Sequence, residues 1–237
     1  MKLRKNPAIF AALAFCLCGA PYAWAKDKEC AGRSGLPIVK LLPPPPCGAC
    51  EETKAEIDEL LHLQNTRTEE EQKHALADEN RSVGRFFEGA GIAYDASKLE
   101  ACEGFFKARR DDEKQAVNAV KTTFCRKRPY DADIGKSAKL RPLSHEDSFA
   151  YPSGHATYGS VIGLMLAEML PEKRAEIYAR IDDYGHSRMI AGVHHRSDIE
   201  AGKIIGAAID ASLFAREGFL TEFNAAKICV RDAVDLP

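Results

Sequence analysis

Three short blocks of this sequence combine basic, histidine and acidic side chains with helix boundaries. The first runs from Lys121 to Pro129 and contains four basic residues and no acid. Positive groups of this kind suit a phosphate or another anion. The carboxyl end of a helix also favours cations, because the helix dipole is negative there. On this block alone, a solvated basic helix end is the simpler interpretation.

The second block, from Tyr151 to His155, comes directly before an apolar stretch that predicts a helix. Ser153 is a typical helix cap, and Gly154 lets an anion approach the free backbone amides at the start of that helix. His155 stands where it could exchange a proton with a bound group. A helix cap with an incidental histidine is the alternative interpretation.

The third block runs from residue 187 to residue 198. His194 and Asp198 are four residues apart, so that on a helix the carboxylate could hold one ring nitrogen and leave the other as a nucleophile or base. His195 is spaced almost as well, and spacing does not choose between the two histidines. A glycine two residues before His194 predicts a chain break that lets Arg188 converge with them. A histidine and aspartate paired on the surface would be the simpler alternative.

The amino terminus has the pattern of a secretory signal peptide. Residues 1–25 form a basic start, an apolar run too short to span a bilayer and an Ala-x-Ala cleavage site. Cleavage after Ala25 would export the chain, and we expect it in the periplasm. The remaining chain has 30 Lys and Arg against 35 Asp and Glu, a net charge of −5 that gives no basic surface for nucleic acid.

Six of the eight cysteines follow residue 25. In an oxidising compartment, an even number of cysteines predicts up to three disulfides, whose pairing the sequence does not determine. Cys47 and Cys50 form a C-x-x-C that follows a proline run and lacks the second C-x-x-C of a zinc site. This context favours a structural role for both cysteines.

After residue 50, apolar residues repeat at the three- and four-residue intervals of a helix, and no alternating run of β-branched residues predicts a strand. We therefore predict an all-α fold, a single-domain helical bundle over residues 51–237. Residues 26–50, which include Pro43 to Pro46, predict an extended proline-rich arm. The stretch 130–151 predicts a long loop. Helices are expected around residues 57–61, 83–87, 105–106, 116–124, 161–170, 177–181 and 199–214.

The order and spacing of the three blocks resemble the tripartite signature of the phosphatidic acid phosphatase type 2 and vanadium haloperoxidase superfamily. The matching positions are Lys121-x6-Arg128-Pro129, Pro152-Ser153-Gly154-His155 and Ser187-Arg188-x5-His194-x3-Asp198. Within the superfamily, the signal peptide, the arm and the second block resemble bacterial class A nonspecific acid phosphatases. Phe149, Ala150 and His195 depart from the residues usual in that family.

The resemblance implies an exported acid phosphatase that hydrolyses small phosphate monoesters of broad structure and could transfer phosphate to other acceptors. Nucleotides, sugar phosphates and aryl phosphates are the expected substrates. No metal, cofactor, membrane or nucleic-acid partner is expected. A homo-oligomer is neither predicted nor excluded.

The resemblance also assigns roles to residues. It makes His194 the nucleophile that forms a phosphohistidine, Asp198 the residue that orients it, and His155 the general acid. Acid conditions, which charge a histidine, would keep His155 protonated. The implied phosphate-binding residues are Lys121, Arg128, Ser153, Gly154 and Arg188.

Two other functions fit part of the same pattern. A vanadate-dependent haloperoxidase would bind vanadate with the same groups and use His194 as a ligand, although the shortness of the chain favours a phosphatase. A non-catalytic exported phosphate-binding protein would need the basic groups. It would leave His155 and the pair of His194 and Asp198 without a role.

Overall fold

The computed structural model describes residues 37–237, so the predicted signal peptide and the first part of the arm lie outside the described residues. Every regular element from residue 37 onward is helical, which confirms the predicted all-α fold. None of these helices is both long and apolar enough to cross a membrane. The elements are η1 (Pro37–Leu41), α1 (Glu51–Thr66), α2 (Glu69–Ala77), α3 (Val83–Ala90), α4 (Ala96–Glu100), α5 (Glu103–Phe124), α6 (Asp133–Ser137), α7 (Gly154–Met169), η2 (Pro171–Lys173), α8 (Arg174–Ile190), α9 (Arg196–Phe214) and α10 (Phe219–Ala233).

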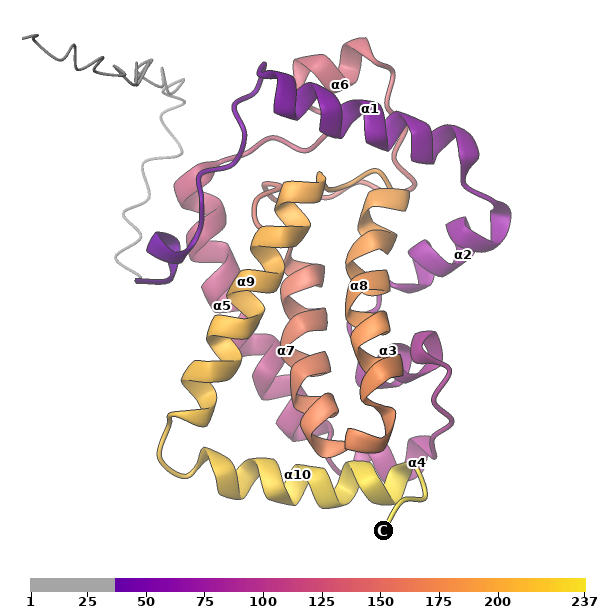
Figure 1. Ribbon diagram of the computed structural model, residues 1–237, viewed down its shortest axis with the longest axis vertical. Helices are drawn as coiled ribbons and strands as arrows, with labels where there is room; N and C mark the ends of the chain where they lie inside the picture. Colours follow the sequence, from indigo (N-terminus) through magenta and orange to yellow (C-terminus); the bar gives the residue numbers. More distant parts are fainter. Residues whose placement is uncertain (1–36) are drawn as a thin grey trace, which may run out of the picture.

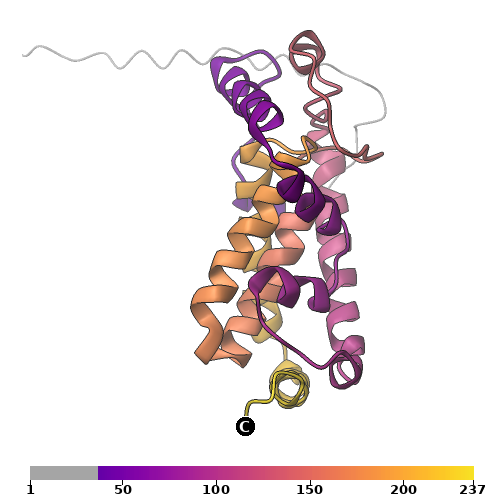
Figure 2. The same ribbon diagram turned by 90° about the vertical axis from the view of Figure 1, so that its right-hand side faces the viewer.

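Helix α7 is the centre of the bundle. Its sequence is apolar or small on all sides, and most of its residues are buried, as expected for a helix surrounded by others. Helices α8 and α9 flank it on one side, and α5 packs on the opposite side (Figures 1 and 2). Helix α10 crosses one end of the bundle, and α1 with α6 lies across the other (Figure 1).

The topology brings the three blocks to the end of the bundle that lies under α1. Helices α5 and α8 end there, and α7 and α9 begin there (Figure 1). The chain break predicted near His194 is present, because Gly192 adopts φ +74° between α8 and α9. A glycine takes this left-handed conformation without steric cost. The turn therefore lets the residues on either side of it face the same space.

The segment 130–151 is less irregular than the predicted loop, because it contains the short helix α6. Gly135 packs so tightly on the Pro129 carbonyl that a Cβ there would lie 1.8 Å from the oxygen. Ile134 and Leu140 join a hydrophobic cluster with Ile57, which lies on α1. This apolar contact gives the five-residue helix the tertiary support that its own sequence lacks.

Among residues 37–237, three cysteines are disulfide-bonded and two are free, which is compatible with the predicted upper limit of three bridges. Cys102 and Cys229 form a disulfide that joins the start of α5 to α10, and Cys125 is also disulfide-bonded. Cys47 and Cys50 are free thiols. The Cys50 thiol donates a hydrogen bond to the carbonyl oxygen of Cys47, 3.1 Å away. This pair therefore contributes no bridge.

Close packing of α9 on α7 depends on two glycines. A Cβ at Gly206 would lie 2.4 Å from the Ser160 Cβ and 2.9 Å from the Thr157 carbonyl oxygen. A Cβ at Gly202 would lie 2.7 Å from the Ser153 carbonyl oxygen, at the start of α7. The backbones of the two helices therefore approach closely at the end that carries the second and third blocks.

We expect Gly206→Ala to destabilise the protein by about 1–3 kcal/mol, because overpacking forces the two helices apart. Gly104→Ala is the matched control, since Gly104 is also helical and a Cβ there meets nothing within 4 Å. The control should be neutral or slightly stabilising. Urea unfolding of both variants measures the difference. Equal stabilities for the two variants would contradict this description of the interface.

Candidate active site

The carboxylate of Asp198 is fully buried at the start of α9, and each of its oxygens has partners. Oδ1 accepts a hydrogen bond of 2.7 Å from an NH group of Arg126. Oδ2 lies 2.8 Å from the backbone nitrogen of His195, 3.0 Å from the Nδ1 atom of the same residue and 3.4 Å from His194 Nδ1. One carboxylate therefore organises both histidines of the third block.

Arg126 is itself held in place by a second carboxylate. Its other terminal nitrogen lies 2.7 Å from Glu56 Oε2, which is on α1. Burial alone would raise the pKa of Asp198, but Arg126, and after it the two histidines, hold that pKa well below its usual value. Asp198 is therefore ionised in the folded protein.

The position of His194 determines which of its ring nitrogens is unprotonated. Its Nε2 atom lies 2.8 Å from a terminal nitrogen of Arg128, and a guanidinium group can only donate hydrogen bonds. Nε2 therefore carries a lone pair, and the proton of the neutral ring is on Nδ1, facing Asp198. Burial and the charge of Arg128 lower the pKa of His194 well below its usual value, which keeps the ring neutral.

The structure distinguishes between the two histidines, which the spacing alone did not do. His195 is also buried, but its Nε2 atom has no hydrogen-bond partner among residues 37–237. His195 lines a cavity that is also bordered by Pro44 to Pro46 of the arm. Of the two neighbouring histidines, it is His194 whose Nε2 contacts a predicted phosphate-binding residue.

Lys121, Arg128 and Arg188 are the three cations among the predicted phosphate-binding residues, here called the cationic cradle, and all three are buried. Lys121 and Arg128 both donate to the Ser148 hydroxyl, at 3.2 and 3.0 Å. Lys121 also donates to the carbonyl oxygen of Phe149, and Arg128 donates to that of Ser148 at 2.7 Å. The loop before α7 therefore supplies most of the oxygen atoms that these two cations contact, and Arg128 also donates to the carbonyl oxygen of Val193 at 2.8 Å.

Arg188 is the least satisfied member of the cradle. One terminal nitrogen lies 2.7 Å from Glu146 Oε1. Its Nε and its other terminal nitrogen are buried and have no acceptor in the described part of the chain. Buried guanidinium donors are normally paired, because leaving them unpaired is costly. An oxyanion placed beside Arg188 would satisfy both.

Burial has a large effect on the pKa of Lys121. Burial, and then the charge of Arg128, lower its pKa to about 7, although Asp198 and Glu146 act in the opposite direction. Lys121 is therefore mostly charged below pH 7 and mostly neutral above it. A bound phosphate would favour the charged form.

Ser153 and Gly154 start α7, as predicted. Ser153 is the N-cap, and its hydroxyl oxygen accepts from the backbone nitrogen of Ala156 at 3.3 Å. This contact leaves the hydroxyl proton available to an anion. The backbone nitrogen of Ser153 donates to the carbonyl oxygen of Asp198, 2.9 Å away, so the starts of α7 and α9 are tied together.

Glu113 lies beside Gly154, although it is not among the residues predicted from the sequence. A Cβ on Gly154 would lie 3.2 Å from Glu113 Oε1, an atom that is buried without a partner among the described residues. Burial raises the pKa of Glu113 to about 7, although Arg81 bonds its other oxygen at 2.9 Å. Glu113 is on α5, where its pattern resembles that of any other charged helix residue, so no sequence signal distinguished it.

His155 is partly buried, and its Nε2 atom lies 3.2 Å from the carbonyl oxygen of Glu79. Burial, and then the charges of Arg188 and Arg81, lower the pKa of His155 well below its usual value. The expectation that acid conditions would keep His155 charged was therefore too simple for the free protein. A bound phosphoryl group would offset the arginine charges and favour the protonated ring.

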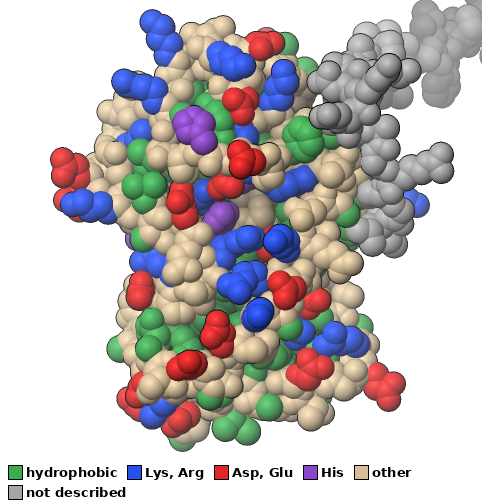
Figure 3. Space-filling model, turned by 180° about the vertical axis from the view of Figure 1, so that it is seen from behind, with side chains coloured by type: hydrophobic (Ala, Val, Ile, Leu, Met, Phe, Trp, Pro, Cys, Tyr) green, Lys and Arg blue, Asp and Glu red, His purple; other side chains and the backbone are tan. Residues whose placement is uncertain are grey.

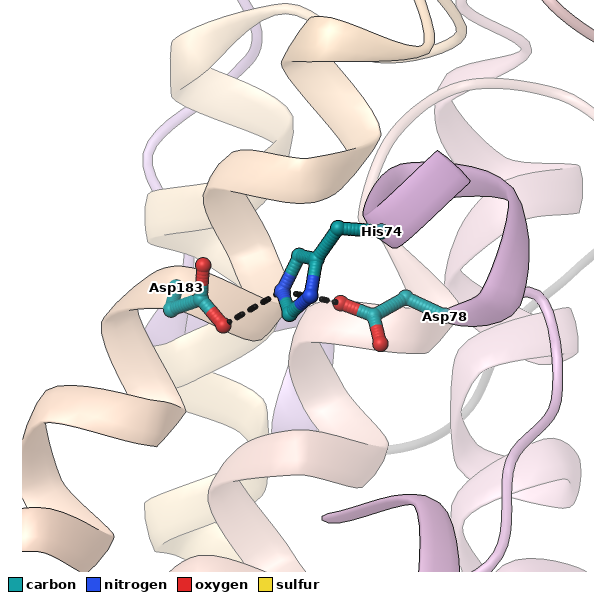
Figure 4. Close-up of side chains that lie close together, drawn as sticks. All are labelled: His74, Asp78 and Asp183. Atoms are coloured by element: carbon teal, nitrogen blue, oxygen red, sulfur yellow. Dashed lines mark hydrogen bonds and ion pairs between the residues drawn. The ribbon is translucent and has the colours of Figure 1, made fainter. Parts of the chain in front are cut away.

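A second cluster, of one histidine and two aspartates, lies outside the set of predicted site residues. His74 Nε2 is 2.9 Å from Asp183 Oδ2 and 3.4 Å from Asp78 Oδ2, a spacing that a metal ion could use (Figure 4). However, Asp78 already binds Arg180 at 2.6 Å and Arg85 at 2.7 Å. Two guanidinium groups on the buried carboxylate make this an ion-pair network and disfavour a metal ion there.

The network around Asp78 positions the predicted site. Asp78 accepts a 2.7 Å hydrogen bond from the hydroxyl of Ser187, the residue before Arg188. The next residue after Asp78 is Glu79, whose carbonyl oxygen lies against His155. Asp78 therefore fixes the loop between α2 and α3 relative to both α8 and the general-acid candidate.

Positive charge is concentrated locally on this acidic chain. Figure 3, which views the molecule from the side opposite to Figure 1, shows Lys and Arg side chains gathered near a histidine in the middle of the face. The net charge of the chain is −2. The total charge therefore does not exclude a local site for an anion.

The eight predicted site residues thus lie at one end of the bundle, and contacts or shared neighbours connect them. The arrangement offers an unprotonated histidine nitrogen, an oriented carboxylate and three cations. Sequence reasoning missed Glu56, Glu146 and Ser148 as well as Glu113. Residues 146 and 148 lie in a loop whose polar residues gave no pattern.

Part of the chain is similar to known proteins. Residues 114–219 match the PAP2 superfamily. The chain is 31% identical over 141 residues to the "Acid phosphatase" of Zymomonas mobilis, covering 58% of this chain and 53% of that protein. It is 37% identical over 123 residues to the "Non-specific acid phosphatase" of Salmonella typhimurium, covering 51% of this chain and 47% of that protein. The matches therefore span about half the length of these relatives.

One solved structure is similar to this chain, and the similarity concerns the fold only. The transmembrane PAP2 type phosphatidylglycerolphosphate phosphatase from Bacillus subtilis matches with a TM-score of 0.51 at 17% identity, covering 70% of this chain and 86% of that chain. The sequence comparisons confirm the predicted resemblance. Residues 114–219 are similar to the PAP2 superfamily, and the chain is similar to bacterial non-specific acid phosphatases.

Proposed function

We propose that this protein is a periplasmic acid phosphatase that hydrolyses small phosphate monoesters through a phosphohistidine on His194, without a metal ion. The main support for this proposal is the contact between the unprotonated Nε2 atom of His194 and Arg128 of the cationic cradle. The names of the similar proteins support phosphatase chemistry. The predicted signal peptide at residues 1–25 and the disulfide between Cys102 and Cys229 support export to an oxidising compartment.

In the proposed first step, the Nε2 lone pair of His194 attacks phosphorus and forms an N–P bond while the bond from phosphorus to the leaving oxygen breaks. His155 gives its proton to the leaving oxygen. Asp198 stabilises the positive charge that develops on the His194 ring. Lys121, Arg128 and Arg188, with the Ser153 hydroxyl and the Gly154 amide, hold the phosphoryl oxygens.

In the second step, water attacks phosphorus and gives a proton to His155, and the N–P bond breaks. Inorganic phosphate leaves, and His194 returns to its neutral form. An alcohol in place of water would give transfer of the phosphate to a new ester. Three fixed cations provide the charge stabilisation that many phosphoryl-transfer enzymes obtain from Mg²⁺, which is the physical support for a metal-independent reaction.

Acid activity is compatible with a histidine nucleophile only if that histidine resists protonation. Burial and Arg128 supply this resistance by lowering the pKa of His194. Acid conditions also charge Lys121, whose pKa is about 7. The same pH range therefore gives a neutral nucleophile and a fully charged cradle.

The test of the proposed function compares two neighbouring histidines. We expect His194→Ala to lower phosphate release from p-nitrophenyl phosphate by at least about 10⁴-fold, since the nucleophile is lost. His195→Phe should retain activity within about tenfold, because Asp198 still holds His194. Steady-state assays at pH 5.5 with excess EDTA measure both. An active His194→Ala protein would exclude the assigned nucleophile, and loss of wild-type activity in EDTA would exclude the metal-free reaction.

A second prediction concerns pH. Because the pKa of Lys121 is lowered to about 7, the free enzyme loses one cradle charge as pH rises through 7. Lys121→Arg keeps that charge, since arginine does not deprotonate in this range. We expect the ratio of wild-type to variant kcat/KM to fall between pH 6 and pH 8. The substrate's own titration cancels in this ratio, so parallel pH profiles would contradict the role of Lys121.

A further inference from the structure

Glu146 places a carboxylate inside the cationic cradle. Its Oε1 atom lies 2.7 Å from a terminal nitrogen of Arg188, and its Oε2 atom lies 3.8 Å from a terminal nitrogen of Arg128. Both arginines are buried. A carboxylate and a phosphoryl group need the same planar guanidinium donors. The two anions therefore compete for the same place.

We propose that Glu146 is an internal competitor that occupies the cradle in the free enzyme and sets its affinity for phosphate. The inference rests on the proposed function, because it assigns the cradle to phosphoryl groups. A substrate binds by replacing the carboxylate on Arg188. When the product phosphate leaves, Glu146 returns to Arg188.

The backbone of Glu146 is anchored, so the exchange needs movement of the side chain only. The hydroxyl of Tyr130 accepts a 2.9 Å hydrogen bond from the backbone nitrogen of Glu146 and donates one of 3.3 Å to its carbonyl oxygen. The loop is also tied at both ends, by Leu143 to Ala191 and by Ala150 to Arg126, each at 2.8 Å.

The side chain of Glu146 also has a path out of the cradle. It is 28% exposed, whereas that of Arg188 is 0% exposed. Asp147 and Ser148 beside it are exposed as well, so solvent reaches this edge of the site. Rotation about the side-chain bonds of Glu146 can therefore move the carboxylate into water while the arginine stays in place.

Charge and hydrogen bonding explain why a phosphoryl group can replace the carboxylate. A phosphate monoester brings up to two negative charges and three oxygens, whereas the carboxylate brings one charge and two oxygens. The two nitrogens of Arg188 that lack acceptors among the described residues would gain them from the additional oxygens. Glu146 satisfies Arg188 only in part, which leaves the phosphate with the stronger set of contacts.

The experiment measures binding of inorganic phosphate by isothermal titration calorimetry at pH 6. We expect Glu146→Gln to lower the Kd by about tenfold, because the substitution removes the competing charge and keeps the shape of the side chain. Glu146→Ala, which also removes the hydrogen bond, should lower it at least as much. Asp147→Asn is the matched control, since it removes the same charge from the neighbouring exposed position, and should change the Kd less than twofold.

Each outcome decides the proposal. An unchanged Kd in Glu146→Gln would overturn it, and so would an equal decrease in Asp147→Asn, which would indicate a general charge effect. Weaker binding in Glu146→Gln would show that Glu146 holds Arg188 in place for phosphate, and would also overturn it. Wild-type protein that binds phosphate but hydrolyses no monoester would instead refute the proposed function and leave the competition intact.

Discussion

The buried carboxylate of Asp198 is the constraint on which the rest of the site depends. A charge with no exposure to solvent must be compensated by fixed partners, and Asp198 has them in Arg126, His194 and His195. Those partners come from three parts of the chain: the end of α5, the turn after α8 and the start of α9. Satisfying one charge therefore fixes the relative positions of the helix ends that carry the first and third blocks.

Burial also shifts pKa values in the site, and the shifts favour a neutral His194. His194 stays neutral because burial and Arg128 oppose its protonation. Arg128 also donates to its Nε2 atom, which leaves the proton on the side of Asp198. In the free protein, the cations of the cradle contact oxygen atoms of the loop before α7, from Glu146 to Phe149. The free protein is thus already arranged around an anion, although that anion is one of its own side chains.

Much of this arrangement could be predicted from the sequence, because local signals marked it. The cap at Ser153, the break at Gly192 and the spacing of His194 and Asp198 are short-range patterns with a direct physical meaning. The choice between His194 and His195 depended on a contact with Arg128, which is distant in the sequence. Before the structure, only the family resemblance indicated His194. Glu56, Glu113 and Glu146 were missed for the same reason, since a glutamate on a helix or loop looks alike whether or not the fold buries it. Whether Cys47 and Cys50 are free or bridged likewise depends on the local geometry of the chain, which the number of cysteines does not reveal.

In the proposed reaction, the ring of His194, held by Asp198, takes the phosphate. Rapid acid quenching of a single turnover tests this step, when it is followed by peptide mapping of the trapped phosphoenzyme under conditions that preserve phosphohistidine. We expect one phosphorylated peptide, with the phosphate on His194 and a rate of formation at least as fast as turnover. Phosphate on His155 or His195, or product formed in the first turnover without any phosphoenzyme, would contradict it.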